Sequence, residues 1–390
     1  MKGKILIIGA GLGGLALAQG LLKSGFDVTV FERDEGPMSR PQGYRISIRT
    51  LGLNALQALL SPEKVSRLSE TKVSDVGDGF TLANEKMEPF FTVTQGQDAA
   101  VQFLRSELRS LLQEGINIEW GKRLINLEDK GKYVAAHFED GSKINGDFLV
   151  GCDGSTSTVR RLLTSTYHSG VGSVPEIVDS HRAILGGQID RDPEWNTLLS
   201  LNKTGLVRFL GPNSYYMGVC FSERADRSPT VFWAFSEEIK DHNAPWYQFD
   251  NGMECRKRIL DHCKELMENE SWHESLKKLV FNTPVEAIMA PWLVRSTQFP
   301  KDEQFPIAPT GRMTLLGDSA HAMPTEKGLG GNNVLEDARL LSSLLASSIS
   351  PIEWPKLTEK FEREMYTRAR AAVQESENAA RYFQSLRPDS

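Results

Sequence analysis

The sequence predicts an α/β fold in which a domain built on a parallel sheet is interrupted by a mostly antiparallel sheet and followed by C-terminal helices. Residues 4–8 and 27–32 are short apolar runs on either side of a helix-like segment at 13–24, which is the pattern of a β–α–β unit. Between about 170 and 295, apolar and polar residues alternate, as in an antiparallel sheet with one covered face. Near residue 313 an apolar run again precedes a helix-like segment, so the first domain resumes there.

The remaining elements follow from the same periodicities. Helices are expected at residues 50–60 and 99–114, at about 250–268, and as one or two long helices over 355–386. Short strands are expected between residues 118 and 154, with turns at Asp140-Gly141 and Asn145-Gly146. The resulting boundaries are 1–75, 99–168 and 296–350 for the first domain, 76–98 and 169–295 for the inserted sheet domain, and 351–390 for the C-terminal helical segment.

Composition restricts the function classes. Hydrophobic residues make up 40% of the 390 residues, which is enough for a substantial core in two or three structural units. The net charge of −6 gives no electrostatic reason to expect a nucleic-acid partner, because such a partner needs a basic surface. The four cysteines form no CxxC pair and no metal-ligand cluster accompanies them, so we expect reduced thiols and no metal site.

The apolar run at residues 5–22 has two interpretations, and a signal peptide is one of them. The run contains five glycines, however, and continues into another strand-like segment, which a nucleotide-binding strand–turn–helix explains and a signal peptide does not. No later segment has ~18 uninterrupted apolar residues, so we expect no membrane span. The sequence therefore predicts a cytoplasmic protein that acts on small molecules, as a monomer or a homodimer.

The β–α–β unit carries a dinucleotide-binding motif at its turn. Residues 9–14 read GAGLGG and match GxGxxG through Gly9, Gly11 and Gly14. The first glycine allows a tight turn, the second lets the backbone approach a pyrophosphate, and the third lets the helix pack closely on the strand. The helix N-terminus then offers free N–H groups and a partial positive charge to the phosphates. With a strand before it and a helix after it, the motif predicts a Rossmann-like domain.

Glu32 ends the second strand of this unit, 18 residues after Gly14. A carboxylate at that place accepts hydrogen bonds from the adenosine ribose and repels a 2′-phosphate. The tightly held dinucleotide is therefore FAD or NAD and not NADP. The motif alone does not choose between FAD and NAD.

Two later motifs favour FAD. Residues 151–155 read GCDGS at the end of an apolar strand, which alone would be an ordinary strand-ending turn. Residues 317–321 read GDSAH and lead through Pro324 into a glycine-rich stretch. A strand that ends in Gly-Asp can direct a carboxylate at a ribityl hydroxyl, and a helix beginning near Gly330 places N–H groups at a ligand such as the flavin ring. His321 invites an acid–base interpretation, but we expect it to fix the loop.

The three motifs together resemble one family, the single-component (group A) flavoprotein monooxygenases with the fold of para-hydroxybenzoate hydroxylase. That family carries GxGxxG, a DG motif and GDAAHxxxPxxGxGxN in this order, and the present sequence reads GAGLGG, GCDGSTSTVR and GDSAHAMPTEKGLGGNN. Two departures are small, because Ser319 replaces a common Ala and Thr325 stands where Pro is frequent. The resemblance spans nearly the whole chain and implies a GR2-type FAD-binding domain with an inserted substrate domain.

The resemblance also implies roles for individual residues. Glu32 should bind the adenosine ribose, Arg105 the ribityl–pyrophosphate part of FAD, and Asp153 both FAD and the reductant. The backbone at Arg45 should lie at the flavin edge, and Asp318 should bind the ribityl or pyrophosphate region. The complete set of expected cofactor-binding residues is Gly9, Gly11, Gly14, Glu32, Arg33, Arg45, Arg105, Asp153, Asp318, Pro324, Gly328, Gly330, Gly331 and Asn332.

The chemistry implied by the resemblance is reduction of FAD by NADPH or NADH, bound transiently, and oxygen transfer from a C4a-hydroperoxyflavin. The expected substrate is an aromatic, phenolic or polyketide-like small molecule that is hydroxylated or epoxidised. Arg182, Tyr215 and Tyr216 are candidate catalytic residues in the sheet domain, where core roles are the alternative. A reductase, an oxidase, a halogenase-like enzyme and a non-catalytic FAD-binding protein stay open, although the halogenase signature WxWxIP is absent.

Overall fold

The computed structural model describes most of the chain, and the structural statements below concern this part. The described residues are 2–39, 45–73, 79–93, 100–168, 174–190, 195–201, 205–212, 215–224, 227–241, 252–301, 303–348 and 350–386.

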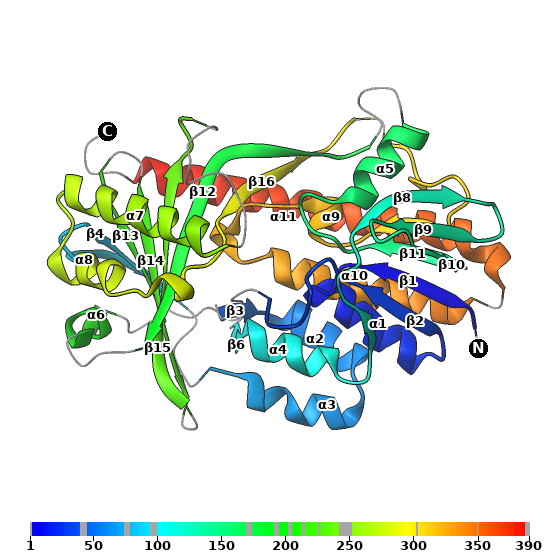
Figure 1. The fold of residues 1–390 in the computed structure, drawn as a ribbon, viewed down its shortest axis with the longest axis horizontal. Helices are drawn as coiled ribbons and strands as arrows, with labels where there is room; N and C mark the ends of the chain where they lie inside the picture. Colours follow the sequence, from blue (N-terminus) through cyan, green and yellow to red (C-terminus); the bar gives the residue numbers. More distant parts are fainter. Residues whose placement is uncertain are drawn as a thin grey trace.

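A five-stranded parallel sheet forms one half of the molecule (Figure 1). Its strands, in spatial order, are β17 (Met313–Leu315), β11 (Phe148–Gly151), β1 (Lys4–Ile8), β2 (Asp27–Phe31) and β7 (Asn117–Glu119). The register pairs Ile8 with Gly151, and Gly151 with Leu315. The carboxyl ends of β1, β11 and β17 therefore lie at the same edge of the sheet, which is where ligands bind in doubly wound sheets.

A seven-stranded sheet forms the other half (Figure 1). Its order is β16 (Trp292–Gln298), β12 (Glu176–Asp190), β15 (Arg227–Glu238), β14 (Tyr216–Arg224), β13 (Leu206–Leu210), β4 (Phe80–Asn84) and β5 (Pro89–Val93). All neighbouring strands are antiparallel except β13 and β4. Two smaller sheets are β10 (Lys143–Gly146) with β9 (Val134–Phe138) and β8 (Leu124–Asp129), and β3 (Arg45–Ile48) with β6 (Val101–Leu104).

Helices pack around both sheets. Those beside the parallel sheet include α1 (Leu12–Lys23), α2 (Thr50–Leu59), α3 (Pro62–Arg67), α4 (Arg105–Gln113), α5 (Thr158–Tyr167), α9 (Asp318–His321) and α10 (Gly330–Ser347). Those of the other half are α6 (Asn196–Leu201), α7 (Met253–Asn269) and α8 (Glu274–Phe281). Short 3₁₀ turns are η1 (Leu68–Thr71), η4 (Val285–Ala287), η5 (Thr325–Lys327) and η6 (Pro351–Glu353).

One long helix, α11 (Trp354–Ser385), connects the two halves. At its start Trp354 packs edge-on against Phe148 of the parallel sheet, with ring centroids 5.4 Å apart. Near its end Phe383 packs edge-on against Phe80 of the seven-stranded sheet, at 5.6 Å. Figure 1 shows α11, drawn orange to red, running along the molecule between these places.

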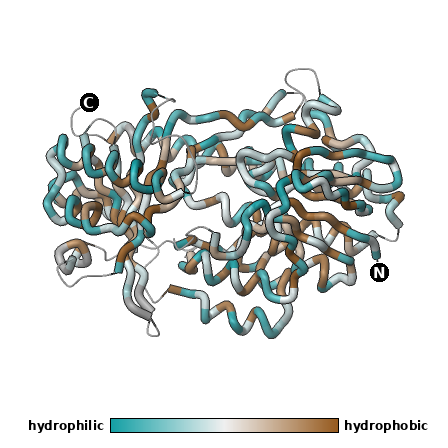
Figure 2. The backbone as a smooth tube through the Cα atoms, viewed as in Figure 1, coloured by the Kyte–Doolittle hydropathy of each residue, from teal (hydrophilic) through white to brown (hydrophobic). Residues whose placement is uncertain are grey.

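Apolar residues separate into two main cores. One surrounds β1, β11 and α1, and the other lies between the seven-stranded sheet and helices α7 and α8. Figure 2 shows hydrophobic segments gathered around the parallel sheet, whereas the outer turns of α7 and α8 are hydrophilic. None of the described helices is long and apolar enough to cross a bilayer. The exact division of the chain into domains remains a prediction.

The sequence-based expectations differ from the structure at several places. Residues 101–104, expected in a helix, form strand β6, and the helix begins only at Arg105. Asn145-Gly146, expected as a turn, lies in β10 opposite Ala135 and Val134. Helix α8 is not among the expected helices, because its eight residues are too short for a clear periodicity. The one or two helices expected over 355–386 are a single helix, α11, which ends at Ser385.

Glu362 of α11 is a buried carboxyl group without a cationic partner. It is fully buried, accepts a hydrogen bond from Ile307 N at 2.8 Å, and lies 2.6 Å from the hydroxyl of Thr314. Burial raises the pKa of Glu362 from 4.5 to about 8. The folded protein therefore keeps a proton there at pH 7 that the unfolded chain loses.

The proton on Glu362 makes stability depend on pH. Because the folded-state pKa is raised, its contribution is fully present below about pH 4.5 and is lost as pH rises toward 8. The free energy of unfolding of wild type should fall by up to about 1.4 kcal/mol per pH unit in this range. We expect this fall to be absent in Glu362→Gln, because its amide mimics the neutral acid. Thermal unfolding at pH 5–8 measures the difference. Glu359→Gln, at a half-exposed ion-paired site on the same helix, is the control. A difference between wild type and Glu362→Gln that stays constant across this range would contradict the assignment.

Candidate functional site

The three sequence motifs meet at the carboxyl ends of β1, β11 and β17. A Cβ atom added to Gly9 would lie 2.4 Å from the carbonyl oxygen of Cys152, so the first motif touches the second. A Cβ atom on Gly13 or on Gly317 would lie 2.3 or 2.4 Å from Cγ2 of Val334 in α10, so the first motif also touches the third. Segments separated by more than a hundred residues thus form one edge of the sheet.

The glycine fingerprint has the geometry that phosphate binding needs. Gly9 has φ +111°, which L side chains rarely adopt, and a Cβ on Gly14 would lie 2.1 Å from the oxygen of Gly9. A Cβ on Gly11 would instead meet nothing within 4 Å. Gly11 begins α1 without a side-chain cap and without an acidic residue in the first turn. The helix N-terminus is therefore open to an anionic ligand.

Glu32 reaches back to this turn. Its carboxylate accepts hydrogen bonds from Ala10 N at 2.8 Å and from Asp34 N at 3.1 Å. Arg109 of α4, which sequence reasoning missed, donates from Nε to the oxygen of Ala10 at 2.9 Å and from Nη1 to that of Pro37 at 3.1 Å. The amphipathic pattern of α4 places Arg109 on the buried side of the helix. A charged residue at an apolar position of this pattern is the sequence feature that indicates a buried role for Arg109.

Asp153 of the second motif binds the first turn of α5, whose N-cap is Ser157. Its carboxylate accepts hydrogen bonds from Ser157 Oγ at 2.5 Å, Thr158 N at 2.7 Å and Val159 N at 3.2 Å. Burial raises the pKa of Asp153, and these hydrogen bonds oppose the rise. Its contact with a cofactor stays a prediction, whereas its local role is to fix the first turn of α5.

Two arginines connect this loop to its surroundings. Arg160, on α5, donates to the carbonyl oxygens of Ser319 and Ser155, both at 2.9 Å. Arg295, on β16 of the seven-stranded sheet, donates to Ser155 Oγ at 3.0 Å. The second motif is thereby tied both to the third motif and to the opposite half of the molecule.

Asp318 of the third motif is exposed to solvent. Desolvation by the surrounding protein nevertheless raises its pKa, while His321 and Arg105 oppose the rise. Arg105, at the start of α4, is close enough for its charge to act on Asp318.

A buried ion network holds the third motif in place. His321 Nε2 lies 2.6 Å from Asp337 Oδ2, and Arg368 Nη2 lies 2.6 Å from Asp337 Oδ1. Burial alone would lower the pKa of His321, but the Asp337 carboxylate raises it more, so the net shift is upward. His321 and Asp337 are fully buried and join α9, α10 and α11. This geometry supports the expected role of His321 in fixing the loop.

The glycine-rich stretch ends at the open N-terminus of α10. Gly328 has φ +62°, and a Cβ added to it would meet nothing within 4 Å. Helix α10 begins at Gly330 without a side-chain cap or an acidic residue in its first turn. The Asn332 amide accepts from Arg49 N at 2.7 Å and donates to the oxygens of Ser47 and Gly328, both at 3.0 Å. Asn332 thus fixes strand β3 against this loop.

The other expected cofactor residues differ in their surroundings. Arg33 is exposed, and Pro324 is buried at the start of η5. Gly331 packs on Ile46, because an added Cβ would lie 2.7 Å from it. Arg45 donates from its guanidinium to the oxygens of Phe221 (3.2 Å) and Gly205 (2.8 Å) in the opposite half. These contacts leave the direct roles of all expected residues as predictions.

The arrangement fits an extended dinucleotide such as FAD. Two open helix N-termini, those of α1 and α10, flank the accessible Asp318, and the glycines between them leave room for a ligand backbone. Glu32 lies beside the turn at Ala10, where its carboxylate would accept hydrogen bonds from an adenosine ribose. Among the described residues, no three His, Cys, Asp or Glu side chains are placed to hold a metal ion.

The three candidate catalytic residues separate onto two faces of the seven-stranded sheet. Tyr215 packs on Phe235 of the core under α7 and α8, with ring centroids 5.3 Å apart. Tyr216 faces the other side, where its hydroxyl lies 3.1 Å from Glu326 Oε1 of η5. The Arg182 guanidinium lies 5.3 Å from the centroid of the Tyr216 ring. Arg182 and Tyr216 therefore face the cofactor motifs, and Tyr215 does not.

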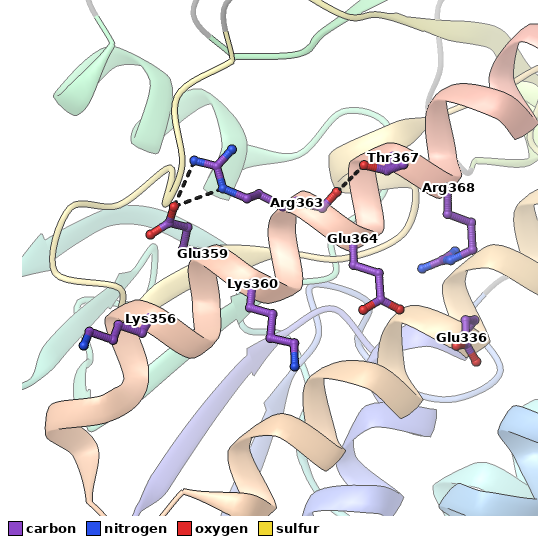
Figure 3. Close-up of a pocket in the computed structure, with 8 residues that line it drawn as sticks. All are labelled: Glu336, Lys356, Glu359, Lys360, Arg363, Glu364, Thr367 and Arg368. Atoms are coloured by element: carbon purple, nitrogen blue, oxygen red, sulfur yellow. Dashed lines mark hydrogen bonds and ion pairs between the residues drawn. The ribbon is translucent and has the colours of Figure 1, made fainter.

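A groove of about 710 Å³ lies elsewhere, along α11 beside Glu336 of α10 (Figure 3). Charged side chains line it and pair with one another, as Arg363 does with Glu359 at 2.9 Å. None of the expected cofactor or catalytic residues contributes to it. It is therefore separate from the candidate site.

Gly11 allows the cofactor site to be tested separately from folding. We expect Gly11→Ala to fold, with a loss of about 1 kcal/mol or less at this helix cap, because its Cβ meets no protein atom. The same methyl group stands where phosphates approach, so FAD affinity should fall roughly 100-fold, or about 2.7 kcal/mol. Fluorescence titration of the apoprotein with FAD and thermal unfolding measure the two effects. Unchanged FAD affinity would show that the fingerprint does not receive the cofactor.

The ion network around Asp337 should be essential for the same site. Asp337→Asn leaves Arg368 and His321 without their buried carboxylate, so we expect a loss of about 3–5 kcal/mol in stability and less bound flavin. Chemical unfolding and the flavin content of the purified protein test this. Asp261→Asn, which removes an exposed pair with Lys257 on α7, should change neither. Equal stability and equal flavin content of the two variants would contradict the structural role of the network.

Comparisons with known proteins agree with this site. The chain matches a family model described as an FAD binding domain over residues 2–262 and 297–376. The FAD-dependent monooxygenase thnD of Trichoderma harzianum is 30% identical, over 87% of this chain and 82% of that protein. The chloroplastic zeaxanthin epoxidase of Oryza sativa subsp. japonica is 28% identical, over 94% and 53%. A candidate FAD-containing monooxygenase of Photorhabdus luminescens subsp. laumondii has a similar structure, with a TM-score of 0.75, 26% identity, and coverage of 98% and 99%. The chain therefore belongs to the family of FAD-dependent monooxygenases.

Proposed function

We propose that this FAD-dependent monooxygenase inserts one oxygen atom of O₂ into an electron-rich aromatic, phenolic or polyketide-like small molecule. NADPH or NADH is the reductant. The observation that carries the substrate proposal is the half-buried contact between Tyr216 and Glu326, because it joins the seven-stranded sheet to the loop of the third motif. Bound and reduced FAD supplies the activated oxygen.

Tyr216 is suited to donate a hydrogen bond rather than to act as a base. Burial raises the pKa of its hydroxyl, and Glu326 raises it further, whereas Arg208 and Arg182 oppose the rise. The phenol therefore stays protonated at neutral pH. In the proposed site it orients a substrate oxygen, while Arg182 holds the phenol ring in place from one side.

The polypeptide also controls access to the reacting atoms. Arg45, Arg295 and Tyr216 each cross from one half of the molecule to the other. These contacts fix the seven-stranded sheet over the cofactor motifs and limit the entry of water. Epoxidation, the activity in the name of the rice relative, is the second candidate reaction. A monomer or homodimer in the cytoplasm completes the proposal, and sedimentation and cell fractionation test those parts.

The reductive and oxidative steps can be tested separately. We expect NADPH or NADH to bleach the flavin of the anaerobic holoenzyme, and faster with one member of a phenol panel. Admission of ¹⁸O₂ should then give a product that carries one labelled oxygen, and the position of that oxygen, read by NMR, distinguishes hydroxylation from epoxidation. Failure of both nucleotides to reduce the flavin under every condition would favour an oxidase or a flavin-binding protein. Reduction without labelled product would favour a reductase.

Tyr216→Phe should reduce kcat/KM for the identified phenol by roughly 10- to 100-fold, or about 1.4–2.7 kcal/mol.

A further inference from the structure

Strand β5 forms an edge of the seven-stranded sheet, and its outer side pairs with no other strand of the described residues. Its sequence is PFFTV, and its first four residues are exposed. Phe90 is 50% exposed and Phe91 is 43% exposed. Such an edge offers unpaired N–H and C=O groups to a further strand, which natural proteins usually prevent with charged side chains. Pro89 removes only one donor, at the first residue of the strand.

The other edges of the three-, five- and seven-stranded sheets differ from β5. Strand β17 is fully buried. Strands β7, β8, β10 and β16 each contain a charged residue, and these residues are Glu119, Glu128, Asp129, Lys143 and Arg295. Among these described edge strands, β5 alone is both exposed and uncharged.

Aromatic side chains continue from β5 to the last turn of α11. The ring centroids of Phe91 and Phe80 are 6.2 Å apart, and Phe80 packs edge-on against Phe383 at 5.6 Å. Phe383 lies 6.1 Å from Tyr382, which is 53% exposed. We call β5 together with Phe80 and Tyr382 the edge patch. Exposed aromatic rings beside an unpaired strand are typical of an interface.

The inner end of this cluster reaches the space where the substrate is proposed to bind. The centroid of the Phe383 ring lies 4.6 Å from the guanidinium carbon of Arg208, on β13. The same carbon lies 5.0 Å from the centroid of the Tyr216 ring. The last turn of α11 therefore connects the edge patch with one wall of that space.

A second copy of this chain suits the edge patch. An unpaired strand needs an extended strand as its partner, and antiparallel pairing with its own copy about a twofold axis puts the same face of both sheets on one side. The two Phe91 rings then lie on the same side as both Tyr382 rings, and the strand brings no charge that repels its copy. Residues 94–99 read TQGQDA, so the segment that follows β5 has no apolar side chain larger than alanine to cover these rings.

A lipid surface suits the patch less well. Membrane-binding surfaces combine aromatic rings with clustered Lys and Arg, which attract anionic lipids. This chain instead has a net charge of −6, and the residue directly before β5 is the exposed Glu88. Charge therefore favours a protein partner.

The exposed area indicates a reversible association. A stable interface buries about 800 Å² on each partner. An aromatic side chain buries roughly 150–250 Å², and Phe90, Phe91 and Tyr382 each have about half of that area left to bury. The three rings thus supply less than half of the usual area, and the strand backbone adds to it. A dissociation constant on the order of 10 μM follows from so small an interface.

We propose that two copies of this protein pair through β5, antiparallel across a twofold axis, with both edge patches buried between them. The two seven-stranded sheets then form one continuous sheet. The last turns of the two α11 helices lie near the axis, because Tyr382 and Phe383 pack beside this edge. The pairing goes beyond the proposed function, which holds for a monomer as well as for a dimer.

Sedimentation velocity of the FAD-loaded protein between about 1 and about 100 μM tests the pairing, because this range spans the expected dissociation constant. We expect wild type to shift from monomer to dimer. Phe91→Lys should stay monomeric, because pairing would bury two like charges near the twofold axis. Ile125→Lys is the matched control and should dimerise as wild type does, since Ile125 is 50% exposed on another edge strand, β8.

Hydrogen exchange distinguishes strand pairing from contacts of other kinds. In wild type, the amides of residues 90–93 should exchange about threefold more slowly at about 100 μM than at about 1 μM, because the dimer protects them. Phe91→Lys should show no such dependence on concentration. Tyr382→Ser should weaken the dimer about tenfold, because it removes one exposed ring from the patch. Thermal unfolding of every variant separates loss of the dimer from loss of the fold.

The outcomes distinguish the interface from the proposed function. Wild type that stays monomeric at every concentration, or a dimer that persists in Phe91→Lys, overturns the interface. A dimer without protection of residues 90–93 overturns the strand pairing. A monomer that binds phosphatidylcholine vesicles, and loses this binding in Phe91→Lys, assigns the patch to a lipid surface instead. Flavin reduction by NADPH or NADH in the same preparations tests the proposed function, so that either result can fail alone.

Discussion

The close approach of the β1–α1 turn to β11 is the constraint on which the rest of the site depends. No side chain fits between Gly9 and the carbonyl oxygen of Cys152, so two backbones meet there directly. This contact and the pairing of β1 with β11 place the first motif beside the second. The pairing of β11 with β17 places the third motif at the same edge of the sheet. Two helices consequently begin at one edge of the sheet, and their open N-termini supply the partial positive charge that phosphates and a reduced flavin need.

The second constraint is electrostatic and acts on the opposite side of the same loop. His321, Asp337 and Arg368 come from three helices, and Asp337 contacts both of its partners only when all three helices are docked. The position of α11 is therefore tied to the conformation of the cofactor loop. Because α11 also ends on the seven-stranded sheet, one helix connects the order of the cofactor site with the wall of the space where a substrate is proposed to bind.

The sequence predicts the features that depend on short stretches of chain. The three motifs and the β–α–β unit follow from glycine spacing and apolar periodicity. Local patterns fail where tertiary pairing overrides them: Asn145-Gly146 has turn chemistry but forms the end of β10, paired with Ala135 and Val134 of β9. Residues 101–104 pair with β3 for the same reason.

Contacts across the molecule could not be predicted from one sequence. The partner of Tyr216 is Glu326, 110 residues later, and nothing in either segment indicates the other. Tyr215 and Tyr216 illustrate the limit, because adjacent strand residues point to opposite faces and a shift of one residue exchanges their roles. Arg109 and Arg208 are visible in the sequence only as charges within apolar patterns, and their surroundings decide what they do.

Three buried or half-buried charged groups show three different solutions to the cost of burial. Glu362 becomes neutral, because burial raises its pKa until it keeps its proton. Asp337 stays ionised, because two cations surround it. Arg208 can do neither, since a guanidinium does not lose its proton at neutral pH and no carboxylate among the described residues pairs with it. The rings of Tyr216 and Phe383 lie against its guanidinium instead, and their cation–π attraction offsets part of the cost of burial without removing the charge.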